Sequence, residues 1–262
     1  MTLSLLDPGR HLVIAHRGAS ADAPENTIEA IELAIEQGCD AFECDVRITS
    51  DGVPVLMHDP TLRRTTGHEG EARHLNLDEV QAVDAGSQYV DAVGGHPYRD
   101  QGIRVPTLRE VLRSFAAMPL IIEIKDPAAQ DAVAGLLLAE GAADRCVVAS
   151  FKPHALEAFR KPPFLVGGDR REILKLYFKG RLGLPLTPRG LMFAIPDYWK
   201  GRVELPLPGV VQAANRMGSP VHVWTVDDPT RAQTLCHRGV SGILTNRPGE
   251  IRAALRSRGF LP

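Results

Sequence analysis

Short apolar runs alternate with segments of helical periodicity along almost the whole chain. The run at 12–15 is rich in β-branched residues, and apolar residues at helical spacing follow it, with Thr27 as N-cap and Gly38 as terminator. The alternation is interrupted at residues 60–106 and continues after them. The apolar runs predicted as strands lie at 12–15, 41–48, 53–57, 120–125, 146–150, 164–167, 191–195, 221–226 and 242–245. Repeated strand-then-helix order predicts a parallel sheet.

Nine such runs in 262 residues, without a GxGxxG motif, favour a (β/α)8 barrel over an open sheet. One run is then an addition to the barrel or half of a hairpin. Residues 60–106 break the rhythm and look helical only at 77–83, so we expect an inserted lid or binding loop there. Because no linker or low-complexity tract divides the chain, residues 1–262 are predicted to form one domain.

Acidic residues interrupt two of the predicted strands. Glu43 and Asp45 lie two positions apart and share a face of their strand, and Glu123 lies inside an otherwise apolar run. Like charges held side by side are unfavourable without a cation between them. An oxygen-only set of this kind suits one hard divalent ion, Mg²⁺ or Ca²⁺. The alternative is a salt-bridge network in which the acids are neutralised by Arg17, Arg47 and Lys125.

Two histidines accompany these acids near strand ends, where the active sites of barrels form. We expect His16 and His58 to exchange acid and base roles, since imidazole gains and loses protons near neutral pH. Arg17 and Lys125 are expected to hold phosphate oxygens. If runs 41–48 and 53–57 form a hairpin turning near residues 50 and 51, Glu43 falls opposite His58; a parallel arrangement stays possible. The grouping indicates metal-assisted chemistry on a phosphate ester.

The composition and net charge limit the classes of molecule that this protein is expected to bind. The chain is 44% apolar and 24% charged, with a net charge of −2, so no basic field indicates nucleic acid. No apolar run approaches the roughly 20 residues that span a bilayer, and the first residues lack the features of a signal peptide. We therefore expect a cytoplasmic protein with a small-molecule substrate, monomeric or homodimeric. Four cysteines without metal-ligand spacing are expected to be reduced core thiols.

The ordered motifs HRG (16–18), PENT (24–27), ECD (43–45), HDPTLRRTTG (58–67), EIK (123–125) and VWTVDDP (223–229) resemble those of the glycerophosphodiester phosphodiesterases. The resemblance spans residues 12 to about 250. It implies a TIM barrel with a small insertion after the third strand, and hydrolysis of glycerophosphodiesters to sn-glycerol 3-phosphate and an alcohol through a cyclic phosphate. It also implies roles for seven residues. These are the acid/base pair His16 and His58, the metal ligands Glu43, Asp45 and Glu123, and the phosphate contacts Arg17 and Lys125.

Some features stay open. Asn246 stands where members of that family commonly carry Asp, which we expect to alter only a minor contact. Trp224 ends a predicted strand and either stacks on the substrate or belongs to the core. Residues 170–190 are expected to form a solvated helix followed by a loop, with lipid contact as the alternative. Alternative functions are a lysophospholipase D-like or phosphoinositide phosphodiesterase on the same barrel, or a barrel that binds glycerophosphodiesters without catalysis.

Overall fold

Eight parallel strands close into a barrel in the computed structural model, which describes residues 3–180, 189–199, 203–205 and 208–262. Their spatial order is β6-β5-β4-β2-β1-β11-β10-β7. They are β1 (Leu12–His16), β2 (Ala41–Ile48), β4 (Leu120–Ile124), β5 (Cys146–Ala149), β6 (Leu165–Val166), β7 (Phe193–Pro196), β10 (Val221–Trp224) and β11 (Gly242–Thr245). Two backbone hydrogen bonds, Leu191 N to Val166 O (2.8 Å) and Gly168 N to Met192 O (2.7 Å), join the ends of this order. The predicted (β/α)8 barrel is confirmed.

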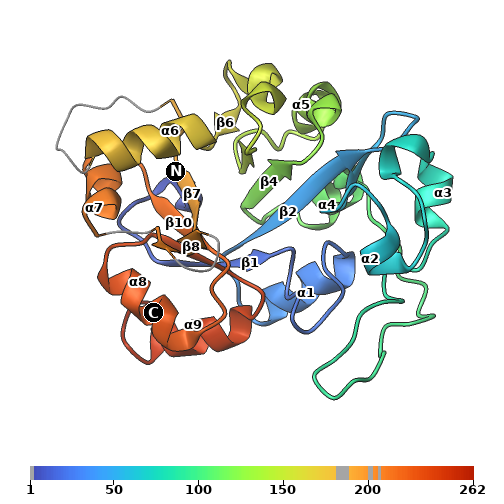
Figure 1. The fold of residues 1–262 in the computed structure, drawn as a ribbon, viewed down its shortest axis with the longest axis horizontal. Coiled ribbons are helices and arrows are strands. Elements are labelled where there is room, and N and C mark those ends of the chain that lie inside the picture. The colour runs from blue at the N-terminus through green and yellow to red at the C-terminus, as the bar shows by residue number, and fades with distance from the viewer. Residues whose placement is uncertain (1–2, 181–188, 200–202, 206–207) are drawn as a thin grey trace.

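Helices pack around the barrel (Figure 1). They are α1 (Ile28–Glu36), α4 (Leu108–Ser114), α5 (Gln130–Ala139), α6 (Arg170–Lys175), α7 (Pro208–Arg216), α8 (Pro229–His237) and α9 (Pro248–Arg256). The first begins as predicted, because the Thr27 hydroxyl accepts a hydrogen bond from Ala30 N. After α6 the chain continues as the π-helical turn η5 (Leu176–Gly180), and residues 181–188 lie outside the described part of the chain. No described helix is long and apolar enough to cross a membrane.

The ninth predicted run is half of a hairpin. Strand β3 (Pro54–Leu56) pairs antiparallel with β2, with Val46 opposite Leu56. Carried two residues further, this register sets Cys44 opposite His58, so the expected pairing of Glu43 with His58 is wrong by one residue. The reason is the turn. Thr49 N bonds Val53 O, which leaves three loop residues rather than two, and the left-handed Gly52 (φ 83°) completes the loop.

The inserted segment follows β3, the third strand in chain order, and lies beside the barrel near α1 (Figure 1). It contains α2 (Arg63–Thr66), the 3₁₀ turn η2 (Ala72–His74) and α3 (Leu77–Gln81), the last close to the predicted helix at 77–83. A small apolar cluster fixes it to the hairpin. Its buried members are Val55, Val80, Ala85, Ile103 and Val105. A second unit, outside the barrel, is the unpredicted hairpin of β8 (Tyr198–Trp199) and β9 (Val203–Glu204).

The barrel interior changes from apolar to polar along the strands. Leu12, Ile14 and Ala41 lie in one buried cluster with Ile121 and Met192. Side chains alternate along a strand, so the inward positions that follow Ile14, Ala41 and Ile121 are histidine and acids. The polar groups therefore lie at the carboxyl ends of the strands, where loops can reach them. All four cysteines are buried and form no disulfide, as predicted.

Candidate active site

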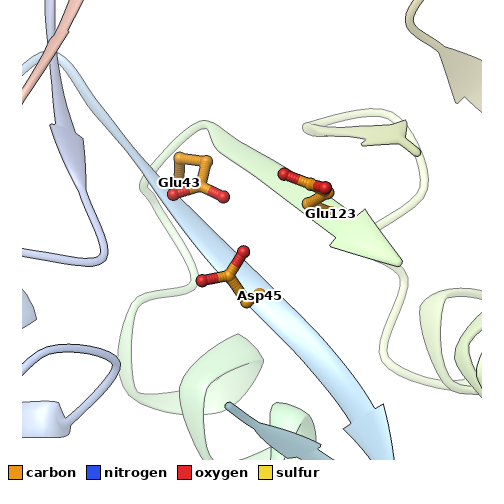
Figure 2. Close-up of side chains that lie close together, drawn as sticks. All are labelled: Glu43, Asp45 and Glu123. Atoms are coloured by element: carbon orange, nitrogen blue, oxygen red, sulfur yellow. The ribbon is translucent and has the colours of Figure 1, made fainter. Parts of the chain in front are cut away.

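Three carboxylates meet at the carboxyl end of the barrel. Glu43 and Asp45 project from β2, and Glu123 projects from β4, where it is the register partner of Asp45. One oxygen of each lies within 4.8 Å of the others, and Figure 2 shows the three groups facing one another. Glu43 and Asp45 are only 4% and 1% exposed. The structure therefore brings together the three acids that the sequence singled out.

The charges of these acids are only partly compensated. Burial, together with the charges of Asp45 and Glu123, raises the pKa of Glu43 well above its usual value. Burial also opposes ionisation of Asp45, but Lys125 and Arg17 outweigh it and lower the pKa of that carboxyl. Glu43 Oε2 is buried and accepts no hydrogen bond from the described residues. An unpaired buried oxygen in a set of carboxylates fits a divalent cation that prefers oxygen ligands.

Two cations line the same site. Lys125 Nζ lies 3.0 Å from Asp45 Oδ1 and 2.8 Å from Glu123 Oε1, and Arg17 Nε lies 2.9 Å from Asp45 Oδ2. The salt-bridge network considered from the sequence thus exists around Asp45. It does not satisfy Glu43, and Arg47 takes no part, because its guanidinium donates to the carbonyl oxygen of His58. Ion pairing accounts for two of the acids and leaves the third uncompensated.

The backbone that carries Arg17 is unusual. Arg17 has φ 61° and Asn26 has φ 58°, both in the left-handed region. Asn26 holds Asp45 from two sides, since its Nδ2 donates to Oδ2 and its Oδ1 accepts from Asp45 N, each at 3.1 Å. Gly18 follows with φ 84°, and a Cβ there would lie 2.5 Å from the carbonyl carbon of Ala30. This close turn aims Arg17 at the acids.

His16 ends β1, opposite Glu43 in the register of β1 and β2. Its Nε2 lies 4.0 Å from Glu43 Oε2, and its Nδ1 lies 2.8 Å from Asn246 Oδ1. Burial, assisted by the charge of Arg17, lowers the pKa of the His16 imidazole. The substitution of Asn for the family's usual Asp at 246 therefore falls on a side chain that contacts the imidazole of His16, and the size of its effect stays a prediction. The sequence placed it after the last strand but could not show which side chain it would meet.

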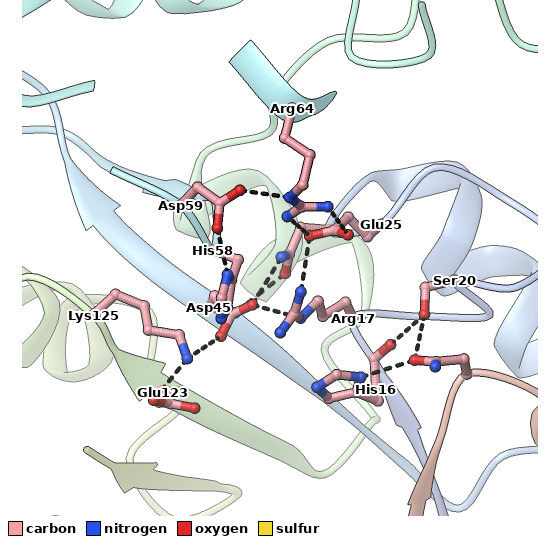
Figure 3. A network of polar contacts seen from close by, with 12 residues as sticks. His16, Arg17, Ser20, Glu25, Asp45, His58, Asp59, Arg64, Glu123 and Lys125 are labelled. Atoms are coloured by element: carbon pink, nitrogen blue, oxygen red, sulfur yellow. Dashed lines mark hydrogen bonds and ion pairs between the residues drawn. The ribbon is translucent and has the colours of Figure 1, made fainter. Parts of the chain in front are cut away.

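His58 is held by a chain of charges that begins in the insertion. Its Nδ1 lies 2.7 Å from Asp59 Oδ1, and Arg64 Nε donates to Asp59 Oδ2 at 2.5 Å. Arg64 also donates to both oxygens of Glu25, which in turn accepts from Arg17 Nη1 at 3.0 Å (Figure 3). Sequence reasoning missed Asp59 and Arg64, although the motif HDPTLRRTTG contains both. The network links α2 of the insertion to both sides of the site.

A cavity of about 270 Å³ opens beside these groups. Both histidines, Glu43, Glu123, Arg17 and Lys125 line one part of it, and mostly apolar side chains line the rest. Trp224 is half-buried on this apolar wall, with its ring edge-to-face against Phe151 at 5.6 Å between centroids. Arg170 and Ile173 of α6 also contribute to the lining. The cavity can therefore receive a ligand with a charged centre and an apolar portion.

Comparisons with known proteins agree with this geometry. Residues 16–162 and 169–250 match the glycerophosphoryl diester phosphodiesterase family. A glycerophosphodiester phosphodiesterase of Caldanaerobacter subterraneus is 29% identical over 95% of this chain and 99% of its own. One similar solved structure is an Oleispira antarctica phosphodiesterase in complex with the product sn-glycerol-3-phosphate (26% identity, TM-score 0.76, 94% and 96% coverage). Another is a glycerophosphodiester phosphodiesterase of Agrobacterium tumefaciens, with 27% identity and a TM-score of 0.75 over 97% of this chain and 100% of its own. This chain belongs to the glycerophosphoryl diester phosphodiesterase family and is a phosphodiesterase of that kind.

Proposed function

We propose that this enzyme hydrolyses glycerophosphodiesters to sn-glycerol 3-phosphate and an alcohol with one divalent cation, Mg²⁺ or Ca²⁺, held by Glu43, Asp45 and Glu123. The observation that carries the proposal is the convergence of these three carboxylates beside two imidazoles in one cavity. The product bound to the Oleispira relative supports the same product here. When bound, the cation would polarise the phosphoryl oxygens and lower the pKa of a coordinated hydroxyl.

The side chains of the chain itself account for the proton transfers. Each imidazole engages a partner through Nδ1, Asn246 for His16 and Asp59 for His58, which leaves Nε2 of each available. In the first step a glycerol hydroxyl attacks phosphorus and gives its proton to one Nε2. The bond from phosphorus to the alcohol breaks as the other imidazolium protonates the leaving oxygen. Water then opens the cyclic phosphate with the two roles exchanged, so both histidines return to their starting states.

Arg17 and Lys125 are proposed to bind the phosphate oxygens. Both already face the acids, so a phosphate entering between them and the cation would gain charge-assisted hydrogen bonds. Trp224 and Phe151 offer an apolar surface against which the C–H groups of glycerol or of the alcohol can pack. These groups orient the ester in the cavity.

A metal-replete assay on glycerophosphocholine, with sn-glycerol 3-phosphate as readout, tests this proposal. His16→Ala and His58→Ala should each reduce kcat by more than about 10⁴-fold while the circular dichroism spectrum stays unchanged. His68→Ala is the matched control, because this exposed histidine of the insertion should leave kcat unchanged. Near-normal turnover of either active-site variant would refute the acid/base pair. Full turnover in excess EDTA would remove the cation from the mechanism.

A lysophospholipid is a second candidate substrate. Leu174 and Phe178 are 48% and 71% exposed and follow Ile173, which lines the cavity, so an acyl chain leaving the cavity would meet apolar side chains. The same assay with lysophosphatidylcholine separates the two. Turnover of the lysophospholipid alone would replace the first proposal, and turnover of glycerophosphocholine alone would exclude the second.

A further inference from the structure

Asn246 lies between His16 and a carboxylate that no catalytic role explains. Its Oδ1 lies 2.8 Å from His16 Nδ1 and accepts from the Ser20 hydroxyl, also at 2.8 Å. Its Nδ2 donates to Asp227 Oδ2 at 2.8 Å. The other carboxylate oxygen, Oδ1, accepts from Asn246 N at 2.8 Å and from the Thr245 hydroxyl at 2.9 Å. A continuous row of hydrogen bonds therefore runs from Asp227 to His16.

The direction of every bond in this row follows from Asp227. An ionised carboxylate only accepts, so the amide group of Asn246 must turn its Nδ2 toward Asp227 and its oxygen toward His16. An oxygen facing the imidazole requires the proton to reside on Nδ1. The lone pair then resides on Nε2, which is the nitrogen on the side of Glu43. Asp227 thus determines, through one amide, which nitrogen of His16 can accept a proton.

The same row of hydrogen bonds would form if the bond between the side chains of residues 227 and 246 ran in the opposite direction. With Asn at 227 and Asp at 246, the amide oxygen at 227 would still accept from the backbone N of residue 246 and from Thr245. Its Nδ2 would donate to the carboxylate at 246, and that carboxylate would accept from His16 and Ser20. No donor or acceptor is lost, and the negative charge moves one side chain closer to His16.

We propose that Asp227 and Asn246 form one reversible positioning pair that sets the Nδ1–H tautomer of His16, and that their amide and carboxylate can exchange places. Neither residue lines the cavity, and both act through His16, so the effect on activity rests on the proposed function. The pair also explains how this chain can carry Asn at 246, because the carboxylate that fixes the row stands at 227.

The two single substitutions should fail for different reasons. In Asp227→Asn, the amide at 227 keeps its oxygen on Asn246 N and Thr245, so its Nδ2 faces the Nδ2 of Asn246. Two donors cannot bond to each other, so the side-chain amide of Asn246 flips by about 180° and presents its Nδ2 to His16. The imidazole then accepts at Nδ1 and carries its proton on Nε2. In Asn246→Asp, two carboxylates face each other across a 2.8 Å contact, which costs stability through like-charge repulsion.

A double-mutant cycle on the Mg²⁺-loaded enzyme tests the pair. Asp227→Asn should lower kcat by about 10–100-fold, the usual range for partners that orient a functional histidine, with KM little changed. Asn246→Asp should lower both kcat and the melting temperature. The double variant should return to within about threefold of the wild-type kcat. Asp228→Asn is the matched control: it removes a carboxylate at the adjacent position, keeps an N-cap for α8, and should be silent.

Two outcomes of the kinetic cycle overturn the proposal. One is single variants with wild-type kcat, and the other is a folded double variant no more active than the weaker single one. Long-range ¹H–¹⁵N correlation spectra of the imidazole give a readout independent of turnover. They should show the Nδ1–H tautomer of His16 in the wild type and the double variant, and the Nε2–H tautomer in Asp227→Asn. An unchanged tautomer in Asp227→Asn contradicts the pair even if the wild type proves inactive on glycerophosphodiesters.

Discussion

Acid should destabilise this barrel through His222, a histidine that takes no part in the active site. His222 is fully buried inside the barrel, and its Nε2 lies 2.9 Å from the carbonyl oxygen of Leu5. Its Nδ1 has no hydrogen-bond partner among the described residues. Burial lowers the pKa of His222 from 6.5 to about 4, because the charged imidazolium would lose its water. The folded protein therefore holds this histidine neutral.

The sign and size of the effect follow from linkage. Between pH 6.5 and 4 the unfolded chain binds a proton at His222 that the folded barrel does not, so the free energy of unfolding falls as the pH falls. With these two pKa values the loss between pH 7 and pH 5 is about 2 kcal/mol, on the basis of 1.36 kcal/mol per pKa unit. For a protein of this size that corresponds to a decrease in melting temperature of roughly 4–8 °C.

Urea unfolding of the wild type and of His222→Gln at pH 7 and pH 5 measures this term. Glutamine keeps a donor for Leu5 O but cannot ionise, so the variant should lose about 2 kcal/mol less than the wild type over the same pH interval. Titration of surface carboxylates affects both proteins equally and cancels in the difference. The variant will be less stable at pH 7, since it packs less well, but only the pH dependence counts. Equal losses in the two proteins would show that His222 is not the titrating group.

Three further predictions concern the site. Glu43→Gln removes a buried carboxyl whose ionisation is opposed by burial and by the charges of Asp45 and Glu123. It should raise the melting temperature of the EDTA-treated protein by a few degrees, while turnover with Mg²⁺ falls by about 100-fold or more. Arg64→Gln should lower kcat by about tenfold, because Asp59 and His58 lose their anchor. It should cost at most about 1 kcal/mol of stability, since Arg64 is 49% exposed, and the neighbouring Arg63→Gln should alter neither value. Trp224→Ala should raise KM severalfold with kcat largely kept, and a collapse of kcat at unchanged KM would contradict its packing role.

The strands and the polar groups at their ends could be predicted because both depend on local pattern. Glu43 and Asp45 are two residues apart in one strand, so their shared face follows from the geometry of any strand. Glu123 joins them because β2 and β4 are parallel neighbours, which the alternation of strands and helices implies. The hairpin register could not be predicted to the residue, since one extra loop residue shifts every pair and both turn lengths suit the sequence Ser50-Asp51-Gly52.

The partners of the two histidines show where such prediction stops. Asp59 is adjacent to His58, yet adjacency does not show that Nδ1 faces the carboxylate. Arg64 meets Asp59 and Glu25 together only once the insertion has folded beside the barrel. Asn246 and Asp227 lie more than 200 residues from His16. Asn246 meets His16, and Asp227 meets Asn246, only when the barrel closes and β11 pairs with β1. A family motif can assign His16 its chemistry. The nitrogen that performs it depends on hydrogen bonds that exist only in the closed barrel, and for this reason the exchange of residues 227 and 246 is a sharper test of the site than removal of His16.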